Sequence, residues 1–278
     1  MPNNNSKVAH YETNLVGRDF VCGDLHGCYE DLMKALDLLG FNRLIDRLFS
    51  VGDLIDRGPD SLQCAALIYE IWFILVPGNH EQLMVASTLD NSSRHTDCWN
   101  DNGGIWHHSE DKTELKQLSE LMKDLPLVIT VGSGEARFNI VHAELIHTNS
   151  DTGRIVGLVT DETIDNWLFS VDDEEGMTWG RTLITNGKAI SQPVNVSKLV
   201  QDMDKLSLTF VGHTPVREVV QVQKQMYIDT GAVFSVKPKS SEQNHLTFAC
   251  PAEKMLYQYN MVRKTISTVA FDDVPKMH

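Results

Sequence analysis

The sequence is poor in cysteine and lacks the cysteine spacings that indicate a metal ribbon or a disulfide framework. Its five cysteines are scattered over 278 residues, are odd in number and never occur as Cys-x-x-Cys. This distribution argues against zinc ribbons and small disulfide-rich secreted proteins. We therefore expect the protein to work in the reducing environment of the cytoplasm.

The sequence also lacks an excess of positive charge and a long apolar run. Its formal net charge of -14 argues against nonspecific binding of nucleic acid or anionic membranes, because no basic patch could dominate that field. The longest apolar run, around 67–77, is broken by Glu70 and is shorter than the about 20 residues that span a bilayer. The polar stretch 1–14 has no apolar segment typical of a secretory signal. We expect no nucleic-acid and no membrane partner, and bound metal would neutralise part of the acidic excess.

The first part of the chain alternates predicted strands and helices. Helix 28–40 has Leu32, Ala35, Leu36 and Leu39 at helical spacing and ends at Gly40. The predicted strands are 19–24, 47–53 and 71–79, and the predicted helices are 28–40, 59–70 and 81–88. Strands separated by helices of this length indicate βαβ units and a parallel core.

The remainder is predicted to be richer in strands. A helix at 113–124 and a short helix near 162–169 stand among the predicted strands 125–131, 137–143, 206–213, 216–222, 225–233, 246–250 and 255–259, and 237–244 is predicted to be a loop. We expect one domain over 1–278, with a core of about 17–260 between a polar N-terminal tail and a C-terminal extension. The expected fold class is mixed α/β, a β-sandwich of mixed sheets flanked by helices.

Polar clusters follow five of the predicted strands. They are GDLHG at 23–27, GDLIDRG at 52–58, GNHE at 78–81, VHAE at 141–144 and GHT at 212–214. The carboxyl ends of neighbouring parallel strands lie side by side, where ligands bind in open α/β folds. We therefore expect all five clusters to lie on one edge of the sheet.

These clusters supply oxygen and imidazole donors without any thiolate. The candidate metal ligands are Asp24, His26, Asp53, Asn79, His142 and His213. Such donors suit a pair of divalent ions such as Mn²⁺, Fe²⁺ or Zn²⁺, held about 3.5–4 Å apart by a bridging carboxylate. One Asp-Gly or one buried histidine is usually turn chemistry or a core residue. Turn chemistry does not explain five such clusters at five strand ends.

The series of clusters resembles the metallophosphoesterase superfamily, specifically the phosphoprotein phosphatases. It is most similar to the bacteriophage-lambda-type serine/threonine phosphatases and their bacterial relatives, with further likeness in GGIWH, LPLVI, GHTPV and QMYIDTGAVF. The similarity spans about 20–234. It implies a metal-dependent phosphomonoester hydrolase that acts on a phosphoprotein or phosphopeptide by direct attack of a water shared between two divalent ions, commonly Mn²⁺.

The resemblance also assigns roles to individual residues. It implies that Asp24, His26 and Asp53 bind one metal and that Asp53, Asn79, His142 and His213 bind the other, with Asp53 bridging. It implies that His80 and Asp56 form the catalytic acid pair, and that Arg57, Arg181 and Asn79 bind the phosphate. We expect Glu81 to serve as structural support, either by capping the following helix or by bracing the loop.

The sequence departs from the family pattern at two places. Glu144 stands where close relatives have aspartate after His-Ala, and Gly180 replaces a polar residue before Arg181. The segments 147–177 and 182–206 also look expanded, which would reshape the substrate groove.

Two other functions remain open at this point. A symmetrical dinucleoside-polyphosphate hydrolase has a similar core, but that family typically lacks the aspartate of DRG and has GNHD, whereas Asp56 and Glu81 are present here. A non-catalytic binding protein with a phosphatase fold would be indicated by lost ligands, and none of the six is lost.

Overall fold

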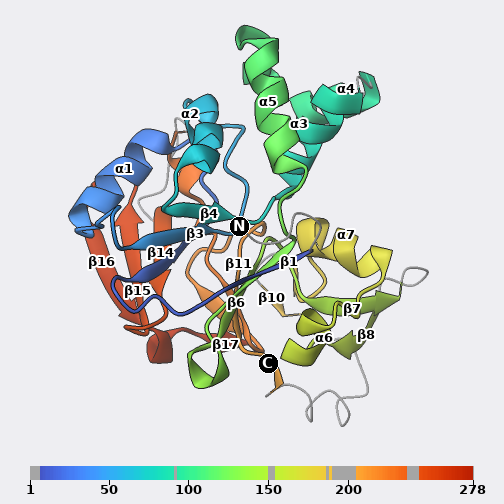
Figure 1. The fold of residues 1–278 in the computed structure, drawn as a ribbon. Helices are drawn as coiled ribbons and strands as arrows, with labels where there is room; N and C mark the ends of the chain where they lie inside the picture. The colour runs from blue at the N-terminus through green and yellow to red at the C-terminus, as the bar shows by residue number, and fades with distance from the viewer. Residues whose placement is uncertain are drawn as a thin grey trace.

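Two β-sheets packed face to face form the centre of the molecule, and helices cover their outer faces (Figure 1). The computed structural model describes residues 7–90, 93–149, 154–185, 188–189, 205–236 and 244–277. The expected mixed α/β sandwich is confirmed. Among these described residues no helix is both long and apolar enough to cross a membrane.

The strands of the three predicted βα units lie in the six-stranded sheet. Its order is β16 (Ile266–Ala270), β15 (Met255–Asn260), β14 (His245–Cys250), β2 (Asp19–Cys22), β3 (Arg47–Ser50) and β4 (Phe73–Leu75). β2, β3 and β4 are parallel, as predicted, with Val21 opposite Phe49 and Phe49 opposite Ile74. β14, β15 and β16 add an antiparallel edge.

The seven-stranded sheet is assembled from segments far apart in the sequence. Its order is β1 (Val8–Tyr11), β5 (Val128–Val131), β6 (Phe138–Val141), β11 (Leu208–Val211), β13 (Gln225–Tyr227), β12 (Val220–Val222) and β17 (Lys276–Met277). β6 and β11 run parallel to each other. The first strand of this sheet, β1, and the last, β17, lie outside the expected core of 17–260. β1 lies in the stretch that we expected to be a polar tail.

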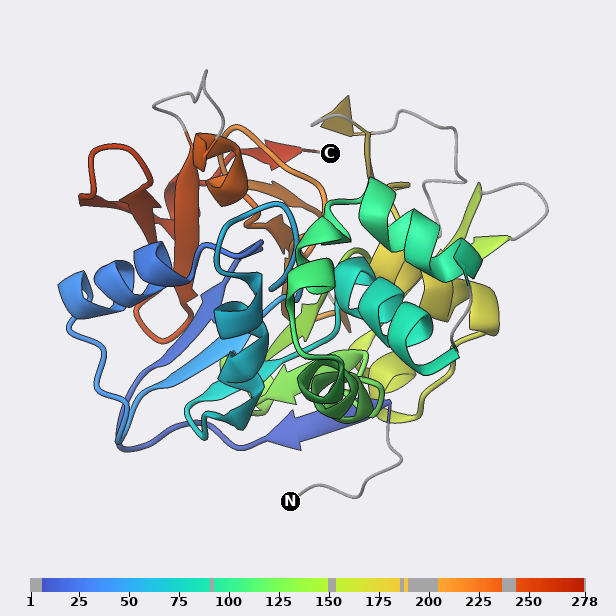
Figure 2. The same ribbon diagram turned by 90° about the horizontal axis from the view of Figure 1, so that it is seen from above.

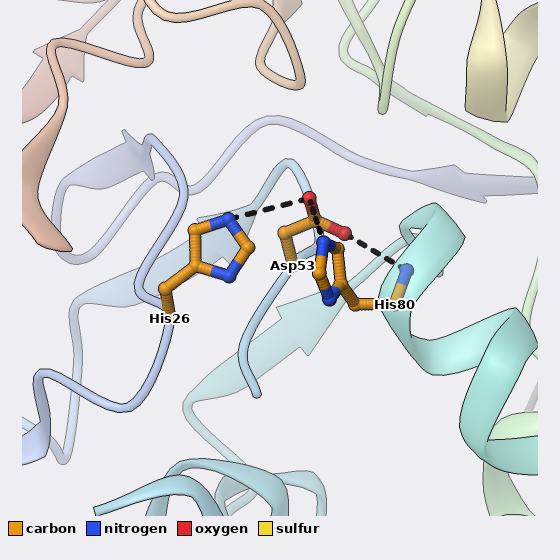
Figure 3. Close-up of side chains that lie close together, drawn as sticks. All are labelled: His26, Asp53 and His80. Atoms are coloured by element: carbon orange, nitrogen blue, oxygen red, sulfur yellow. Dashed lines mark hydrogen bonds and ion pairs between the residues drawn. The ribbon is translucent and has the colours of Figure 1, made fainter. Parts of the chain in front are cut away.

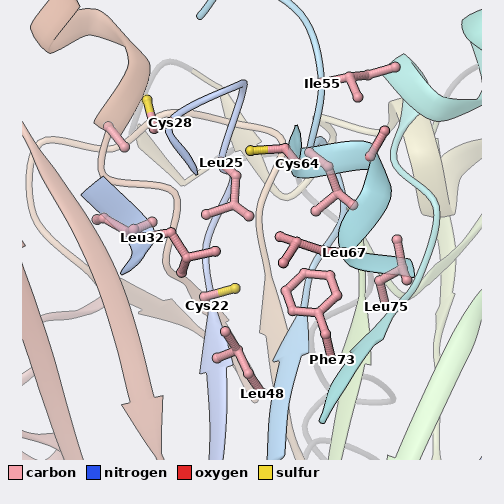
Figure 4. Packing of buried hydrophobic residues seen from close by; sticks show 14 of the residues in the cluster. Cys22, Leu25, Cys28, Leu32, Leu48, Ile55, Cys64, Leu67, Phe73 and Leu75 are labelled. Atoms are coloured by element: carbon pink, nitrogen blue, oxygen red, sulfur yellow. The ribbon is translucent and has the colours of Figure 1, made fainter. Parts of the chain in front are cut away.

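Alternation along the strands sorts their side chains into layers. Successive residues of a strand point to opposite faces. On β2, Phe20 packs with the helices outside the sheet, whereas Val21 packs against the other sheet. On β3, Leu48 and Phe49 divide in the same way. Figure 4 shows the outer side of this sheet, where Leu48 and Phe73 meet the apolar residues of the neighbouring helices.

Helices cover both outer faces of the sandwich. On the six-stranded side are α1 (Tyr29–Leu38), α2 (Ser61–Ala66) and η1 (Leu67–Tyr69); α3 (Asn79–Asp90), α4 (Ser93–Asp101), η2 (Gly104–Ser109) and α5 (Lys112–Met122) stand together beside them (Figures 1 and 2). On the seven-stranded side lie α6 (Asp161–Asp165) and α7 (Val171–Trp179), with the hairpin of β7 (Ile146–Asn149) and β8 (Arg154–Leu158). Short elements complete the described chain: η3 (Gly134–Ala136), β9 (Ile184–Thr185), β10 (Lys188–Ala189), η5 (Ala232–Val236) and η6 (Phe271–Asp273).

The segment after His147 contains more regular structure than the sequence predicted. The expected helix near 162–169 is α6, which is shorter, and the hairpin β7–β8 and helix α7 were not predicted. α7 is rich in acidic residues, and a capping box between Ser170 and Asp173 begins it. Most of the predicted loop 237–244 and much of 182–206 lie outside the described residues.

Candidate metal centre

The predicted ligands converge where the ends of strands from both sheets meet. Asp24, Asp53 and Asn79 follow β2, β3 and β4 of the six-stranded sheet, whereas His142 and His213 follow β6 and β11 of the other. The prediction of a single sheet edge was therefore wrong. The sheets pack face to face with these strand ends at the same end of the sandwich, and the His213 N–H donates to the Asp24 carboxylate across the junction. All six predicted ligands are buried.

One donor group forms around His26 and Asp53 (Figure 3). His26 Nδ1 lies 2.8 Å from the Ile55 carbonyl, so Nδ1 carries the hydrogen and Nε2 offers a lone pair. Nε2 lies 3.5 Å from Asp53 Oδ2 and 4.0 Å from Asp24 Oδ2. Burial lowers the pKa of His26 to about 3, and the neutral imidazole is the form that binds metals.

A second donor group shares the other oxygen of the same carboxylate. His142 Nε2 lies 3.4 Å from Asp53 Oδ1 and 3.2 Å from Asn79 Oδ1. The Asn79 oxygen is also 2.9 Å from His213 Nδ1. His142 Nδ1 donates to the Val51 carbonyl at 2.7 Å, so the neutral ring points a lone pair at two acceptor oxygens.

Such a convergence of acceptor oxygens favours positive charge, which a protonated His142 or a bound metal ion can supply. Burial lowers the pKa of His142, but Asp53 and the Val51 carbonyl raise it, and the net shift is upward. Burial raises the pKa of Asp53, yet the neighbouring histidines, His142 first, hold it well below its usual range. A negative carboxylate that belongs to two groups of oxygen and imidazole donors fits two divalent ions. The residues present therefore fit the metals that the sequence predicted.

His80 lies at the same place but has a different set of contacts. Its Nδ1 is 2.5 Å from Asp56 Oδ2, and its Nε2 is 2.8 Å from Arg57 Nη2 and 3.9 Å from Asp53 Oδ2. Arg57 Nη1 also donates to His26 Nε2 at 2.5 Å. Distance alone groups His80 with His26 and Asp53. The carboxylate on Nδ1 nevertheless distinguishes it from His26 and His142, whose Nδ1 atoms donate to backbone carbonyls.

The backbone around these residues is strained. Nine non-glycine residues of the described chain have positive φ, and five of them are predicted site residues: His26, Asp53, Asp56, Arg57 and His213. The left-handed conformation costs such residues about 1–3 kcal/mol each, and it persists only where the surroundings enforce it.

Glu81 holds one of these strained residues, Asp53, in place. Its carboxylate accepts hydrogen bonds from the N–H groups of Asp53, Leu54 and Gly78, at 2.8, 2.9 and 2.8 Å. One buried side chain thus ties the loop after β3 to the loop after β4. The expected role of Glu81 as structural support is confirmed, and it braces the loops.

The two departures from the family pattern lie next to each other. The Glu144 carboxylate accepts from the N–H groups of Thr182 and Leu183, directly after Arg181. A Cβ on Gly180 would lie 3.3 Å from Glu144 Oε2 and 2.4 Å from the Gly176 carbonyl oxygen. Burial raises the pKa of Glu144 to about 7 against the lowering effect of these N–H donors and of Arg181.

Arg181 itself is exposed, unlike the ligands. It follows α7, whose last residue, Trp179, lies with its ring 6.4 Å from that of His213. The structure therefore brings Arg181 to the rim of the centre, whereas the six ligands, Asp56 and His80 are buried. Arg57 is exposed as well, but its guanidinium contacts the His26 and His80 rings.

Two tryptophans that were not predicted as site residues contact the centre. Trp99 and Trp106 both donate their indole N–H to Asp56. Trp106 belongs to the GGIWH motif, and this motif was the feature of the sequence from which its role could have been predicted.

Comparison with known proteins identifies a family and individual relatives. The family of calcineurin-like phosphoesterases matches residues 20–217. Serine/threonine-protein phosphatase 1 of Salmonella typhimurium is 33% identical over 218 residues, which are 77% of this chain and 87% of that protein. A symmetrical bis(5'-nucleosyl)-tetraphosphatase of Nitrosomonas europaea is 42% identical over 69 residues, 24% of this chain and 26% of that protein. A serine/threonine phosphatase structure from Saccharomyces cerevisiae has a TM-score of 0.59 at 18% identity, covering 96% of this chain and 84% of that one.

The fold and the site define a metallophosphoesterase. The chain belongs to the calcineurin-like phosphoesterase family and is a phosphatase hydrolase.

The close packing at the junction of the two sheets predicts the effect of one added methyl group. A Cβ on Gly212 would lie 2.1 Å from Asp24 Oδ1 and 2.5 Å from Val51 Cγ2. We expect Gly212→Ala to displace the Asp24 carboxylate, lowering both the bound metal, measured by elemental analysis, and the phosphatase rate. Gly176→Ala is the matched control, because its Cβ would meet nothing within 4 Å. Wild-type metal content in Gly212→Ala would contradict this account of the junction.

Proposed function

We propose that this protein is a serine/threonine phosphoprotein phosphatase with a single metallophosphoesterase domain. It uses two divalent metal ions, and Mn²⁺ is the ion that we propose. The observation that carries the proposal is the Asp53 carboxylate shared by two donor groups beside the His80–Asp56 pair. The substrate class is supported by the likeness to the Salmonella phosphatase, which extends over 87% of that protein. The tetraphosphatase likeness extends over 26% of its protein.

Asp24, His26 and Asp53 would hold one ion, and Asp53, Asn79, His142 and His213 the other. When bound, the ions supply concentrated positive charge that activates water and offsets the charge of the phosphate. The five cysteines are free in the structure, which supports the reducing cytoplasm as the place of action.

In this proposal, Arg57, Arg181 and the Asn79 amide bind the phosphate. The Arg57 guanidinium already reaches between His26 and His80. Its planar fork of N–H donors matches phosphate oxygens better than a lysine would. Arg181, on the rim, would approach the phosphate from the solvent side.

In this proposal, His80 donates a proton to the leaving group. A serine or threonine alkoxide is a poor leaving group, and a placed general acid relieves that difficulty. Asp56 binds Nδ1 of the imidazole and so directs Nε2 toward Arg57 and Asp53, where the phosphate would lie. His80 would therefore act as the acid without serving as a metal ligand.

The first test concerns the metals. Exhaustive dialysis against chelator should abolish activity, and Mn²⁺ should restore it. Asp53→Asn should nearly abolish turnover and reduce the bound metal, because this carboxylate belongs to both groups. Asp19→Asn, at the opposite end of β2, is the control. Full activity without metal would refute the two-ion proposal.

The second test concerns the substrate. In Mn²⁺, a phosphoserine or phosphothreonine peptide should be hydrolysed much faster than diadenosine tetraphosphate. A phosphotyrosine peptide measured in parallel defines the range among phosphoproteins. The reverse preference, for the dinucleotide, would assign the chain to the nucleotide hydrolases.

The third test separates a proton donor from a metal ligand. His80→Asn should keep its metal and lose about 10²–10⁴-fold in kcat on a phosphoserine peptide, as expected for a missing general acid. The loss on p-nitrophenyl phosphate should be much smaller, because nitrophenolate leaves without a proton. Equal losses on both substrates, or a missing ion, would show that His80 serves the metals or the phosphate.

A further inference from the structure

The carboxylate of Asp56 is held by more than its bond to His80. It has no exposed surface, and its Oδ1 lies 2.9 Å from Trp99 Nε1 and 2.7 Å from Trp106 Nε1. Its Oδ2 lies 2.5 Å from His80 Nδ1 and 3.0 Å from Trp99 Nε1. A carboxylate removed from water needs such donors to replace its lost hydration.

The two indoles reach Asp56 because of the tight turn between α4 and η2. Their rings meet edge to face, with centroids 5.9 Å apart. Gly103 has a φ of +107°, and a Cβ on Gly104 would lie 2.5 Å from the Trp99 ring. The Gly103 carbonyl also accepts from the Arg57 N–H at 3.3 Å. The GGIWH motif thus closes over the loop that carries Asp56 and Arg57.

Indole is a suitable group for this position because its N–H can only donate. A hydroxyl could turn and offer a lone pair to the carboxylate, whereas an indole cannot. Trp106 donates to Oδ1, Trp99 is shared between both oxygens, and the imidazole of His80 meets Oδ2. With Nδ1–H of His80 directed to Oδ2, Nε2 is the nitrogen that faces Asp53 and Arg57.

We propose that Trp99 and Trp106 are positioning residues that hold Asp56, and through it the His80 imidazole, in the orientation needed for proton donation. The part of this inference that concerns proton donation rests on the proposed function. The hydrogen bonds themselves are independent of it.

The kinetic test uses Trp99→Phe, Trp106→Phe and the double variant, which retain an aromatic ring but lack the N–H. Each single variant should lose about 10-fold in kcat on a phosphoserine peptide, with a larger loss in the double variant, because a hydrogen bond to a charged group is removed. On p-nitrophenyl phosphate the loss should be less than about 3-fold, and the metal content should be unchanged, since the general acid matters little for that leaving group.

Trp72→Phe is the matched control. Trp72 is also buried in the core, and its Nε1 donates to Glu70 Oε2, outside the candidate metal centre. It should keep the wild-type rates on both substrates. In a His80→Asn background, Trp106→Phe should have little further effect on phosphoserine, because positioning acts through His80.

An activity-independent measurement separates failure of this inference from failure of the proposed function. The chain has five tryptophans, and the three Phe variants assign the indole N–H signals of Trp72, Trp99 and Trp106 in a ¹H–¹⁵N spectrum. Asp56→Asn should shift the signals of Trp99 and Trp106 and leave that of Trp72 in place. If these signals shift but the wild type does not hydrolyse phosphoserine, the proposed function fails while the hold on Asp56 stands.

Several results would overturn the inference. Unmoved indole signals would show that the tryptophans do not hold Asp56. Equal losses on both substrates would indicate a general structural effect, and unchanged kcat in all variants would show that the indoles do not position the pair. Should buried Trp99→Phe fail to fold, Trp106→Phe, at a partly buried position, carries the same kinetic test.

Discussion

The site depends on keeping one carboxylate, that of Asp53, negative and out of water. Burial of a carboxylate is unfavourable unless donors or cations compensate it. Here, imidazoles of His26 and His142 face its two oxygens, and its own N–H is held by Glu81. Its φ of +51° adds backbone strain to this requirement. The arrangement can persist only because both sheets converge on it.

That convergence explains why glycine precedes two of the ligands, Asn79 and His213. A Cβ on Gly78 would lie 2.1 Å from Asp53 Oδ1, and one on Gly212 would lie 2.1 Å from Asp24 Oδ1. The carboxylates therefore rest directly against the backbone of neighbouring loops. This close approach is possible only without a side chain, and it links the ligand positions to the packing of the sandwich.

Much of the fold and of the candidate site could be predicted from the sequence, because the patterns that indicate them are local. The donors follow predicted strands, and the parallel pairing of β2, β3 and β4 follows from the helices between them. Which sheet β6 and β11 join is not a local property, since periodicity gives burial but not the partner strand. The prediction of a single edge failed for that reason. α7 escaped prediction because its acidic residues and Gly176 obscure the helical pattern, whereas a cap and packing on the seven-stranded sheet stabilise it.

At the rim of the site, the carboxylate of Glu144 holds the segment after α7. The Glu144 side chain is one methylene longer than the aspartate that the resemblance led us to expect, so its carboxylate extends further toward the segment after α7. There it meets Gly180, where a side chain would approach both Glu144 and the Gly176 carbonyl. The contact that excludes a side chain at Gly180 is the one with the Gly176 carbonyl oxygen, 2.4 Å from a Cβ, whereas the Glu144 carboxylate satisfies the N–H groups of Thr182 and Leu183. The Glu144 carboxylate therefore holds the backbone directly after Arg181, and this arginine stands at the rim of the centre.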